Sequence, residues 1–591
     1  MSDELVPEMH DILKLAKKQK LNKDGEEVNP HSQPELLVNR LSTKTWEGIC
    51  KHHHGEGFET WPDSPDLFVL DMADILAAAT SRAFQFGYYE RYEIDDEPFK
   101  LWKDYFEDIE RGRHNRPLDI EEVIEFVSRS PSAEDYIRKY GQQLLHRAEE
   151  TKLGINITSL MTHSLLAGKF YRILRHYKQE VPLDILSDKR KVENFAKNIG
   201  WKLTILKIKI HFPQSPVRAR DMNVFKILED FVDDIKTEFQ DNVLFSTSNE
   251  LRLVSPVGGD VFESIKKKAK EVGFWLDIRQ DDKRINELNL EEIGHPSSEY
   301  PSLSPDIGPR ICEVCQMASG TRDWVTDTLT EHLCEKCYSI RELGARLPKI
   351  GDWEESTENP KVAYLKILLD VEELVSTLKG LYFEYIGHFG IQMAEKRSKI
   401  RFPVIAEFQG DYDAFLSTLE TRIAAEYGEA SIQKILGDFF CIKVEEEREI
   451  KKLLEIYGST FKECFPKFMP NSPIKLSVTC ANVKFPFIWN WKLLEKPKEE
   501  VNVSLIGKGE MNLKLKQLDE LFNMRLPSRK LLIDLSKAAE ISKKLAWVML
   551  NDKGDRRARR TYREFEGFRR AITSSGIDYD SILVFAKMMG S

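Results

Sequence analysis

Apolar residues recur at helical spacing near the beginning of the chain and alternate with polar residues in its middle. Residues 1 to about 185 are predicted to be mostly helical, with apolar helices at 69–82 and 159–174. From about residue 200 the pattern predicts a strand at 201–211, a helix at 223–239, a hairpin at 242–255, a helix at 260–272 and a strand at 273–279. This order is the ferredoxin-like arrangement.

A second unit with the same order of elements follows a linker. The linker is predicted at 296–309, where proline and serine are frequent. Beyond it the pattern predicts a strand at 361–370, a helix from Val371, a hairpin at 432–444 around Gly437 and Asp438, a helix at 445–457 and a strand at 474–481. Residues from about 511 to the end are predicted to be helical again and are basic.

These elements predict an α+β multidomain protein of five regions. The regions are a helical domain at 1–190, a first ferredoxin-like palm domain at 191–295, a linker with a four-cysteine module at 296–358, a second palm domain at 359–505 and a basic helical C-terminal domain at 506–591. A chain of 591 residues has the length of about three to five domains.

Composition narrows the class of protein. The net charge of −10 excludes a generic nucleic-acid-coating protein, so any such binding must come from local basic patches. There is no apolar run of 18 residues and no signal peptide pattern, so we expect a cytoplasmic protein that does not enter a membrane. Eight cysteines without the pattern of a disulfide framework agree with a reducing compartment.

Two Cys-x-x-Cys pairs predict a structural zinc site. The pairs are Cys312 with Cys315 and Cys334 with Cys337, and 18 residues separate them. Four thiolates at this spacing can close a tetrahedral Zn²⁺ site and leave no open coordination position, so the site is expected to be structural. The alternative is four unligated thiols.

Histidines and aspartates in the helical domain predict a divalent-metal hydrolase site. His10 and Asp11 are adjacent, the triple histidine 52–54 follows, and Asp74 and His163 lie on the two apolar helices. Imidazole and carboxylate ligands suit Mn, Fe, Ni, Co or Zn, and two such ions can hold a phosphodiester for in-line attack. The plainer interpretations are a surface His-Asp dipeptide and a core histidine at 163.

The second palm carries fewer acids than a catalytic palm needs. Palm-type polymerases and cyclases hold two Mg²⁺ ions with an acid after the first strand and one or two acids in the central hairpin. Asp370 and Glu372 take the first position, and Asp438 is followed by the bulky Phe439, which supplies no ligand. A structural palm without catalysis is therefore favoured, although Asp370 and Asp438 could still hold one Mg²⁺.

The C-terminal region contains a dense arginine cluster, formed by Arg556, Arg557, Arg559 and Arg560. The bidentate guanidinium suits phosphate, so this cluster predicts contact with a nucleic-acid backbone. A solvated face and a dock for an acidic partner subunit are the alternatives.

The order of these regions resembles the large subunit of type III CRISPR effector complexes. Local segments support the resemblance: Met9 to Leu15 is similar to the family's His-Asp-x-x-Lys segment, and His53-His54 with Ala73-Asp74 and Arg82 is similar to its His-His … Ala-Asp … Arg run. Residues 158–164, Thr-Ser-Leu-Met-Thr-His-Ser, are similar to its Thr-Ser-Leu-x-x-His-Ser helix.

The resemblance implies a site and an activity in the helical domain. In this family the His-Asp (HD) domain is circularly permuted and cuts single-stranded DNA, and a ligand that ordinarily precedes the His-Asp pair comes late in the chain. This implies that His163 is a ligand. The implied divalent ligands are His10, Asp11, His53, His54, Asp74 and His163, holding Mn²⁺, Ni²⁺, Co²⁺ or Mg²⁺. His10, Asp11 and Lys14 are the implied catalytic residues, and His31 is a weaker ligand candidate.

The resemblance also implies partner molecules, and it shows where this sequence departs from the family's palm motif. The family acts in antiviral defence with a small subunit, repeat-backbone subunits, guide RNA and target RNA. Its second palm makes cyclic oligoadenylates when it carries Gly-Gly-Asp-Asp, of which only Gly437 and Asp438 remain here. That departure is typical of lineages with degenerate palms, such as type III-C or type I-D.

Three other functions stay open from the sequence. The first is a scaffold subunit of the same complex without catalysis. The second is an active palm-type nucleotidyl cyclase or oligoadenylate synthase. The third is a phosphohydrolase that acts alone, which leaves the palms unexplained.

Overall fold

The structure is a computed structural model, and part of the chain is described in it. The described residues are 4–20, 27–51, 64–81, 100–103, 117–145, 147, 158–176, 189–209, 224–257, 261–272, 275–284, 297–299, 310–314, 319–325, 330–335, 337–338, 341–342, 361–388, 402–483, 485–523 and 576–589.

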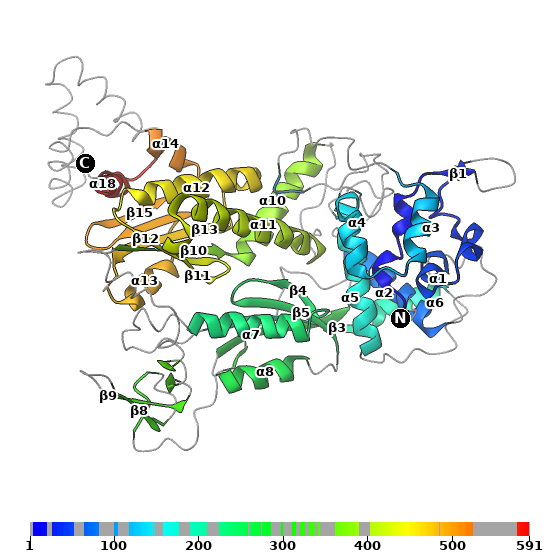
Figure 1. Cartoon of the computed structure of the whole chain (residues 1–591), viewed down its shortest axis with the longest axis horizontal. Helices are drawn as coiled ribbons and strands as arrows, with labels where there is room; N and C mark the ends of the chain where they lie inside the picture. The colour runs from blue at the N-terminus through cyan, green and yellow to red at the C-terminus, as the bar shows by residue number, and fades with distance from the viewer. Residues whose placement is uncertain are drawn as a thin grey trace, which may run out of the picture.

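The N-terminal part of the chain is a helical domain, drawn in blue and cyan in Figure 1. Its α-helices are α1 (Lys44–Lys51), α2 (Pro65–Ser81), α3 (Ile120–Ser128), α4 (Ala133–Leu145), α5 (Leu160–His176) and α6 (Lys189–Asn198). Its short 3-10 helices and two-residue strands are η1 (Pro7–Met9), η2 (Ile12–Leu15), η3 (Pro34–Leu36), η4 (Val38–Arg40), β1 (Gln19–Lys20) and β2 (Glu27–Val28). The expected helices at 69–82 and 159–174 are confirmed as α2 and α5.

Although residues 1 to about 185 were predicted to be mostly helical, the His-Asp pair does not lie within an α-helix. His10 and Asp11 form the turn between η1 and η2. Pro7 stands at the start of η1, and the backbone N–H of His10 donates to the Pro7 carbonyl, so the segment closes as a tight 3-10 turn. This turn is buried, which places both side chains inside the domain.

The first α/β unit has the expected order of elements. They are β3 (Gly200–Lys209), α7 (Val224–Glu238), β4 (Val243–Ser246), β5 (Glu250–Pro256), α8 (Val261–Val272), β6 (Trp275–Arg284) and the added edge strand β7 (Ser297–Glu299). The sheet order is β4-β5-β3-β6-β7 with antiparallel pairing throughout. The four strands of the repeat thus have the ferredoxin-like order.

The second α/β unit repeats this order and extends it. Its elements are β10 (Lys361–Leu369), α10 (Val371–His388), α11 (Phe402–Tyr427), η9 (Glu429–Ser431), β11 (Ile432–Leu436), β12 (Phe439–Val444), α12 (Glu449–Cys464), η10 (Pro466–Phe468), β13 (Ile474–Asn482), α13 (Phe487–Leu494), β14 (Val501–Leu505) and β15 (Gly509–Leu513). The sheet order is β11-β12-β10-β13-β14-β15. The β14–β15 hairpin carries this sheet past residue 505, where we had expected the second palm to end.

The described C-terminal residues pack against the second α/β unit. They form α14 (Gln517–Asn523) and α18 (Tyr579–Met588). Asp578 caps α18 by accepting a hydrogen bond from the backbone N–H of Ser581. The hydroxyl of Ser581 also accepts from the backbone N–H of Asn512 in β15 at 3.0 Å. The arginine cluster at 556–560 lies outside the described residues.

Alternate residues of β10 face two different cores, because successive side chains of a strand point to opposite faces. Ala363 and Leu365 pack with the helices of the second unit. Val362 and Tyr364 pack with residues of the first unit, including Phe225 of α7. A strand that is buried on both faces has a nearly continuous run of apolar residues. This explains why apolar and polar residues alternate so little along β10.

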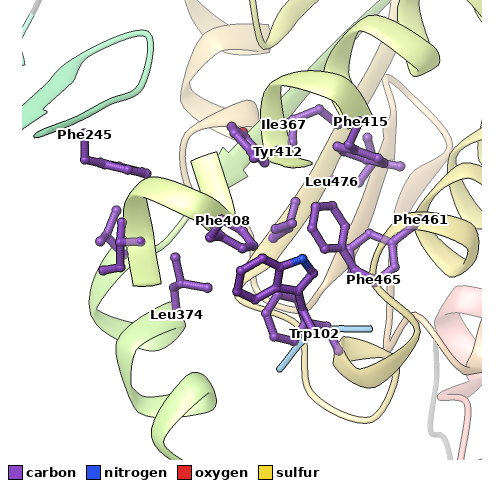
Figure 2. Packing of buried hydrophobic residues seen from close by; sticks show 14 of the residues in the cluster. Trp102, Phe245, Ile367, Leu374, Phe408, Tyr412, Phe415, Phe461, Phe465 and Leu476 are labelled. Carbon is purple, nitrogen blue, oxygen red and sulfur yellow. The ribbon is translucent and has the colours of Figure 1, made fainter. Parts of the chain in front are cut away.

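Helix α11 joins the helical domain to the second unit. Phe408 of α11 is fully buried, and its ring lies 5.4 Å from that of Trp102 and 5.5 Å from that of Phe465 (Figure 2). The same core continues through α2 and α5 of the helical domain. The site in the helical domain is therefore built against the second unit and not on an independent module.

In the sequence, a small cysteine-containing module separates the two α/β units. Its hairpin pairs β8 (Arg322–Val325) with β9 (Thr330–Leu333), and its own small core includes three cysteines. Within the described residues, no helix has both the length and the apolar character that spanning a bilayer requires.

Candidate functional site

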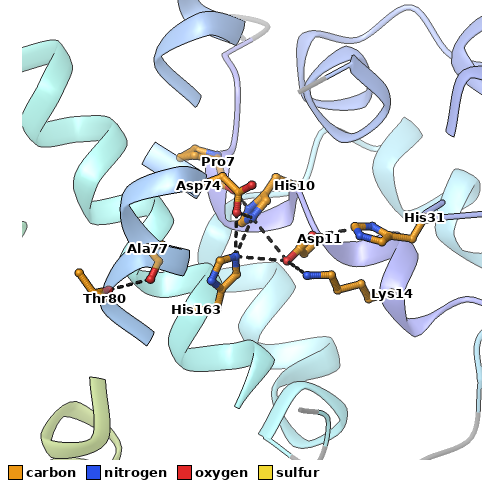
Figure 3. A network of polar contacts seen from close by, with 9 residues as sticks. All are labelled: Pro7, His10, Asp11, Lys14, His31, Asp74, Ala77, Thr80 and His163. Atoms are coloured by element: carbon orange, nitrogen blue, oxygen red, sulfur yellow. Dashed lines mark hydrogen bonds and ion pairs between the residues drawn. The ribbon is translucent and has the colours of Figure 1, made fainter. Parts of the chain in front are cut away.

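Four side chains from three segments meet in the helical domain (Figure 3). His10 and Asp11 come from the η1–η2 turn, Asp74 from α2 and His163 from α5. His10, Asp11 and His163 are at most 2% exposed, and the Asp74 side chain is 17% exposed. A partly exposed carboxylate beside three buried groups gives the cluster one side that faces solvent.

The ligand atoms of these residues converge. Nε2 of His10 lies 3.3 Å from Nε2 of His163 and 3.3 Å from Oδ1 of Asp74. Nε2 of His163 lies 2.9 Å from Oδ1 of Asp74 and 3.3 Å from Oδ2 of Asp11. His10, Asp11 and His163 form a group whose ligand atoms all lie within 4.8 Å of one another.

A backbone carbonyl sets the tautomer of His10. Its Nδ1 lies 2.8 Å from the carbonyl oxygen of Pro7, which can only accept a hydrogen bond. Nδ1 must therefore carry the proton, and in the neutral imidazole Nε2 presents its lone pair to the cluster. This outer contact is of the kind that orients metal-ligating histidines. Sequence reasoning missed this contact, since the pattern around Pro7 carries no sign of a carbonyl's direction.

The geometry fits a divalent ion. Two nitrogen ligands that each lie about 2.0–2.1 Å from one ion are about 2.9–3.4 Å apart at octahedral to tetrahedral angles. The distance of 3.3 Å between the Nε2 atoms of His10 and His163 falls in this range. The buried carboxylate of Asp11 and the partly exposed carboxylate of Asp74 supply the negative charge that a cation offsets. The described group could thus bind a metal, with His, His and Asp as its buried ligands.

Two further candidates contact Asp11. Nζ of Lys14 donates to Oδ2 of Asp11 at 2.7 Å, and the Lys14 side chain is 21% exposed. Nδ1 of His31 lies 3.8 Å from Oδ1 of the same carboxylate. Both residues border the cluster at Asp11. The expected ligands His53 and His54 lie outside the described residues.

The cysteine module brings three of the four expected zinc ligands together. The sulfur atoms of Cys312, Cys334 and Cys337 all lie within 4.8 Å of one another, and the three residues are buried. The backbone N–H of Cys337 donates to Sγ of Cys334 at 3.4 Å. Thiolates about 2.3 Å from a tetrahedral ion stand about 3.8 Å apart, so this group could bind a metal. Cys315 lies outside the described residues.

The hairpin acid Asp438 of the second unit is buried in a network of its own. Its Oδ2 accepts from the hydroxyl of Ser248, in the β4–β5 turn of the first unit, at 2.6 Å. Burial raises the pKa of Asp438, while the nearby Lys366 ammonium acts in the opposite direction. Lys366 is itself buried, and its ammonium lies 3.9 Å from the centre of the Trp491 ring. An internal lysine thus supplies positive charge beside this acid.

The other two acids have separate partners. Asp370 is exposed, and its Oδ1 accepts from the backbone N–H of Glu373, which makes it the cap of α10. Glu372 forms an ion pair with Arg279 of β6 at 3.0 Å. Phe439, beside Asp438, is fully buried against Phe225 and Trp491. None of these acids belongs to either group of three or more metal-ligating residues found among the described residues.

Comparison with known proteins identifies the fold. No protein-family model and no curated protein sequence matches the chain. A crystal structure of the Csm1–Csm4 cassette in complex with one ATP matches 99% of this chain and 98% of the compared chain, with a TM-score of 0.51 at 13% identity. The crystal structure of Csm1 in T. onnurineus matches the same shares with a TM-score of 0.48 at 14% identity.

The chain therefore has a Csm1-like α+β multidomain fold over nearly its full length. This confirms, at the level of the fold, the resemblance to the type III CRISPR large subunit that the sequence motifs indicated. The match at 13% identity concerns the fold and leaves the chemistry of the site to its own residues.

Proposed function

We propose that this chain is the large subunit of an RNA-guided CRISPR effector complex and cuts single-stranded DNA at the His-Asp site. The proposal rests on the convergence of four side chains, His10, Asp11, Asp74 and His163, in which the Nε2 atoms of the two histidines lie 3.3 Å apart. The Csm1-like fold around this cluster supports the assignment to an effector subunit.

The proposed reaction is hydrolysis of a phosphodiester. His10, Asp11, Asp74 and His163 hold the ion, with His53 or His54 as a further ligand. A divalent ion held there lowers the pKa of water and stabilises negative charge on the phosphoryl oxygens. Lys14, which is 21% exposed and held by Asp11, helps to neutralise the phosphate. The Pro7 carbonyl keeps His10 in the tautomer that leaves Nε2 available.

The nuclease proposal is tested with the complete effector complex or the full chain. We expect wild-type protein with Mn²⁺ to cut a single-stranded DNA, and duplex DNA of the same sequence more slowly, because the ligand groups are mostly buried and a flexible strand reaches them more easily than a duplex. The double variant His10→Ala/Asp11→Ala is expected to cleave the DNA more than about 100-fold more slowly than wild type. This loss exceeds the roughly 10–100-fold effect that is typical of residues that only orient a metal ligand. Equal cleavage by both proteins would mean that the activity comes from elsewhere.

We further propose that the second palm makes no cyclic oligoadenylate. The position beside Asp438 holds the buried Phe439, and the Lys366 ammonium affects the pKa of Asp438 more strongly than the nearby Glu229 carboxylate does. Asp370 caps a helix, so the acids needed for two Mg²⁺ ions are not assembled.

This proposal predicts no product from ATP. The wild-type complex, with target RNA and either Mg²⁺ or Mn²⁺, is expected to leave ATP unconverted when the mixture is separated by chromatography. The DNA cleavage of the same preparation serves as its control for integrity. Appearance of cyclic or linear oligoadenylates would establish the rival function, an active palm-type synthase.

The partners follow from the same assignment. Csm1 has been crystallised with Csm4 as a cassette, and we propose that this chain likewise assembles with repeat-backbone and small subunits around guide and target RNA. The arginines at 556–560 are proposed to contact nucleic acid. The four cysteines are proposed to hold a structural Zn²⁺.

A further inference from the structure

The helix that carries His163 begins at a polar contact with the second α/β unit. Ser159 directly precedes α5, and its hydroxyl oxygen accepts from the backbone N–H of Thr162 at 3.2 Å. This is an ordinary N-cap, which satisfies one of the free donors of the first turn. The backbone N–H of Ser159 itself donates to Oε1 of Glu407, in α11, at 2.5 Å.

Glu407, which belongs to the second α/β unit, supplies the carboxylate that a capping box requires at the start of α5. In a capping box, a glutamate or glutamine three positions after the N-cap returns its side chain to the N-cap N–H. Here that position is Thr162, which has no carboxylate and instead donates its hydroxyl to Oε1 of Glu407 at 2.9 Å. The acceptor for the first turn therefore comes from a residue 248 positions further along the chain than Ser159.

The environment of Glu407 indicates a specific role. The residue is 7% exposed, and burial raises the pKa of its carboxyl group, although the Ser159 and Thr162 donors and the Lys100 charge favour the ionised form. A carboxyl group is costly to bury without hydrogen bonds. Its two donors both belong to the first turn of α5, where negative charge is also favoured by the helix dipole.

The same first turn places the metal ligand. The backbone N–H of His163 donates to the carbonyl oxygen of Ser159 at 3.1 Å. This helical hydrogen bond joins His163 directly to the N-cap residue of α5. We propose that Glu407 is a positioning residue, which fixes the first turn of α5 and thereby the place of the His163 imidazole at the metal centre. This inference rests on the proposed metal-dependent function.

The arrangement also connects three parts of the chain through one helix. Two residues after Glu407, the amide of Gln409 exchanges hydrogen bonds with Ser246 of β4: its Oε1 accepts at 3.1 Å and its Nε2 donates at 3.0 Å. α11 thus contacts both the first α/β unit and the start of the ligand-bearing helix. A displacement of α11 relative to α5 would reach His163 through the Glu407 cap.

The test compares two substitutions of Glu407 in the full-length protein. Glu407→Met keeps the volume but removes the acceptor, and Glu407→Gln keeps an oxygen that can accept from both donors. We expect Glu407→Met to raise the Kd for Mn²⁺ by about 10–100-fold, as for other residues that orient a metal ligand, and Glu407→Gln to restore most of the affinity. The visible spectrum of bound Co²⁺ is expected to change in Glu407→Met and to return in Glu407→Gln.

Asp411→Asn is the matched control on the same helix. Asp411 accepts from Lys100 and from the indole N–H of Trp102, and it does not contact α5 in these hydrogen bonds. This variant is expected to lower thermal stability without changing the Kd or the Co²⁺ spectrum. Equal changes in Asp411→Asn and Glu407→Met would overturn the positioning role, because they would indicate general loosening of the domain contact.

Two further measurements keep the inference separate from the proposed function. If wild type itself binds no Mn²⁺ at the His-Asp site, the proposed function fails. Amide hydrogen exchange at residues 159–164 then tests whether Glu407 stabilises the first turn of α5, without reference to metal binding. Faster exchange is expected in Glu407→Met and not in Asp411→Asn. If Glu407→Met does not fold, Thr162→Val replaces it, and an unchanged Kd together with unchanged exchange in that variant would count against the inference.

Discussion

Replacing His163 by alanine is expected to abolish tight binding of Mn²⁺ and cleavage of single-stranded DNA. The imidazole contributes one of two nitrogen atoms 3.3 Å apart, and its Nε2 also lies within 3.3 Å of both carboxylates, so its loss removes a ligand from the centre of the group. We expect the rate to fall more than about 100-fold, beyond the 10–100-fold typical of outer-shell residues. Calorimetric titration with Mn²⁺ measures the binding.

His176→Ala is the control for this prediction. His176 lies on the same helix but is exposed, and 13 residues along an α-helix correspond to about 20 Å. The variant is expected to keep both the affinity for Mn²⁺ and the cleavage rate. A His163→Ala protein that still binds Mn²⁺ as wild type does would show that His163 is a core histidine, the plainer interpretation of the sequence.

Replacing Cys334 by serine is expected to empty the cysteine site and unfold its module. Three of the four buried residues of this small core are cysteines, and β8 and β9 are its main described secondary structure. Structural zinc contributes about 10–16 kcal/mol in zinc-finger peptides, far more than so small an apolar core provides. We expect the zinc content measured by atomic absorption to fall to near zero and limited proteolysis to cut between residues 310 and 342.

Cys464→Ser is the matched control, because Cys464 is half-buried in α12 and belongs to neither ligand group. Its zinc content and its proteolysis pattern are expected to match wild type. The Cys334→Ser protein is also expected to keep cleavage of single-stranded DNA, since the segments that carry the His-Asp cluster pack in cores that do not include the cysteine module. Loss of zinc without any change in proteolysis would contradict a structural role.

The two α/β units could be predicted from the sequence because their strands and helices have strong local patterns. The predicted hairpin around Gly437 and Asp438 is confirmed as β11 and β12, and the helix after Val371 is confirmed as α10. Prediction was weaker where a short segment is fixed by distant contacts. The turn that holds His10 and Asp11 is one example, and the β14–β15 hairpin, which is added in register to a sheet formed by earlier residues, is another.

The sequence by itself determined which chemical groups are available. The pair His10-Asp11 and the spacing of the cysteines are local patterns that ligand chemistry interprets, whereas His163 was assigned as a ligand through the family resemblance. Phe439 stands where a catalytic palm carries a second hairpin acid, and this residue identity is the basis for predicting a palm without catalysis.

Only the tertiary structure decided which of these groups meet and what holds them. His10 and His163 are 153 positions apart, and no local pattern fixes a distance of 3.3 Å between their Nε2 atoms. The direction of the Pro7 carbonyl, the Lys366 charge beside Asp438 and the cap that Glu407 gives to α5 depend on the packing of separate elements. Such contacts arise from the folding of the whole chain around shared cores, and the sequence specifies them only through that fold.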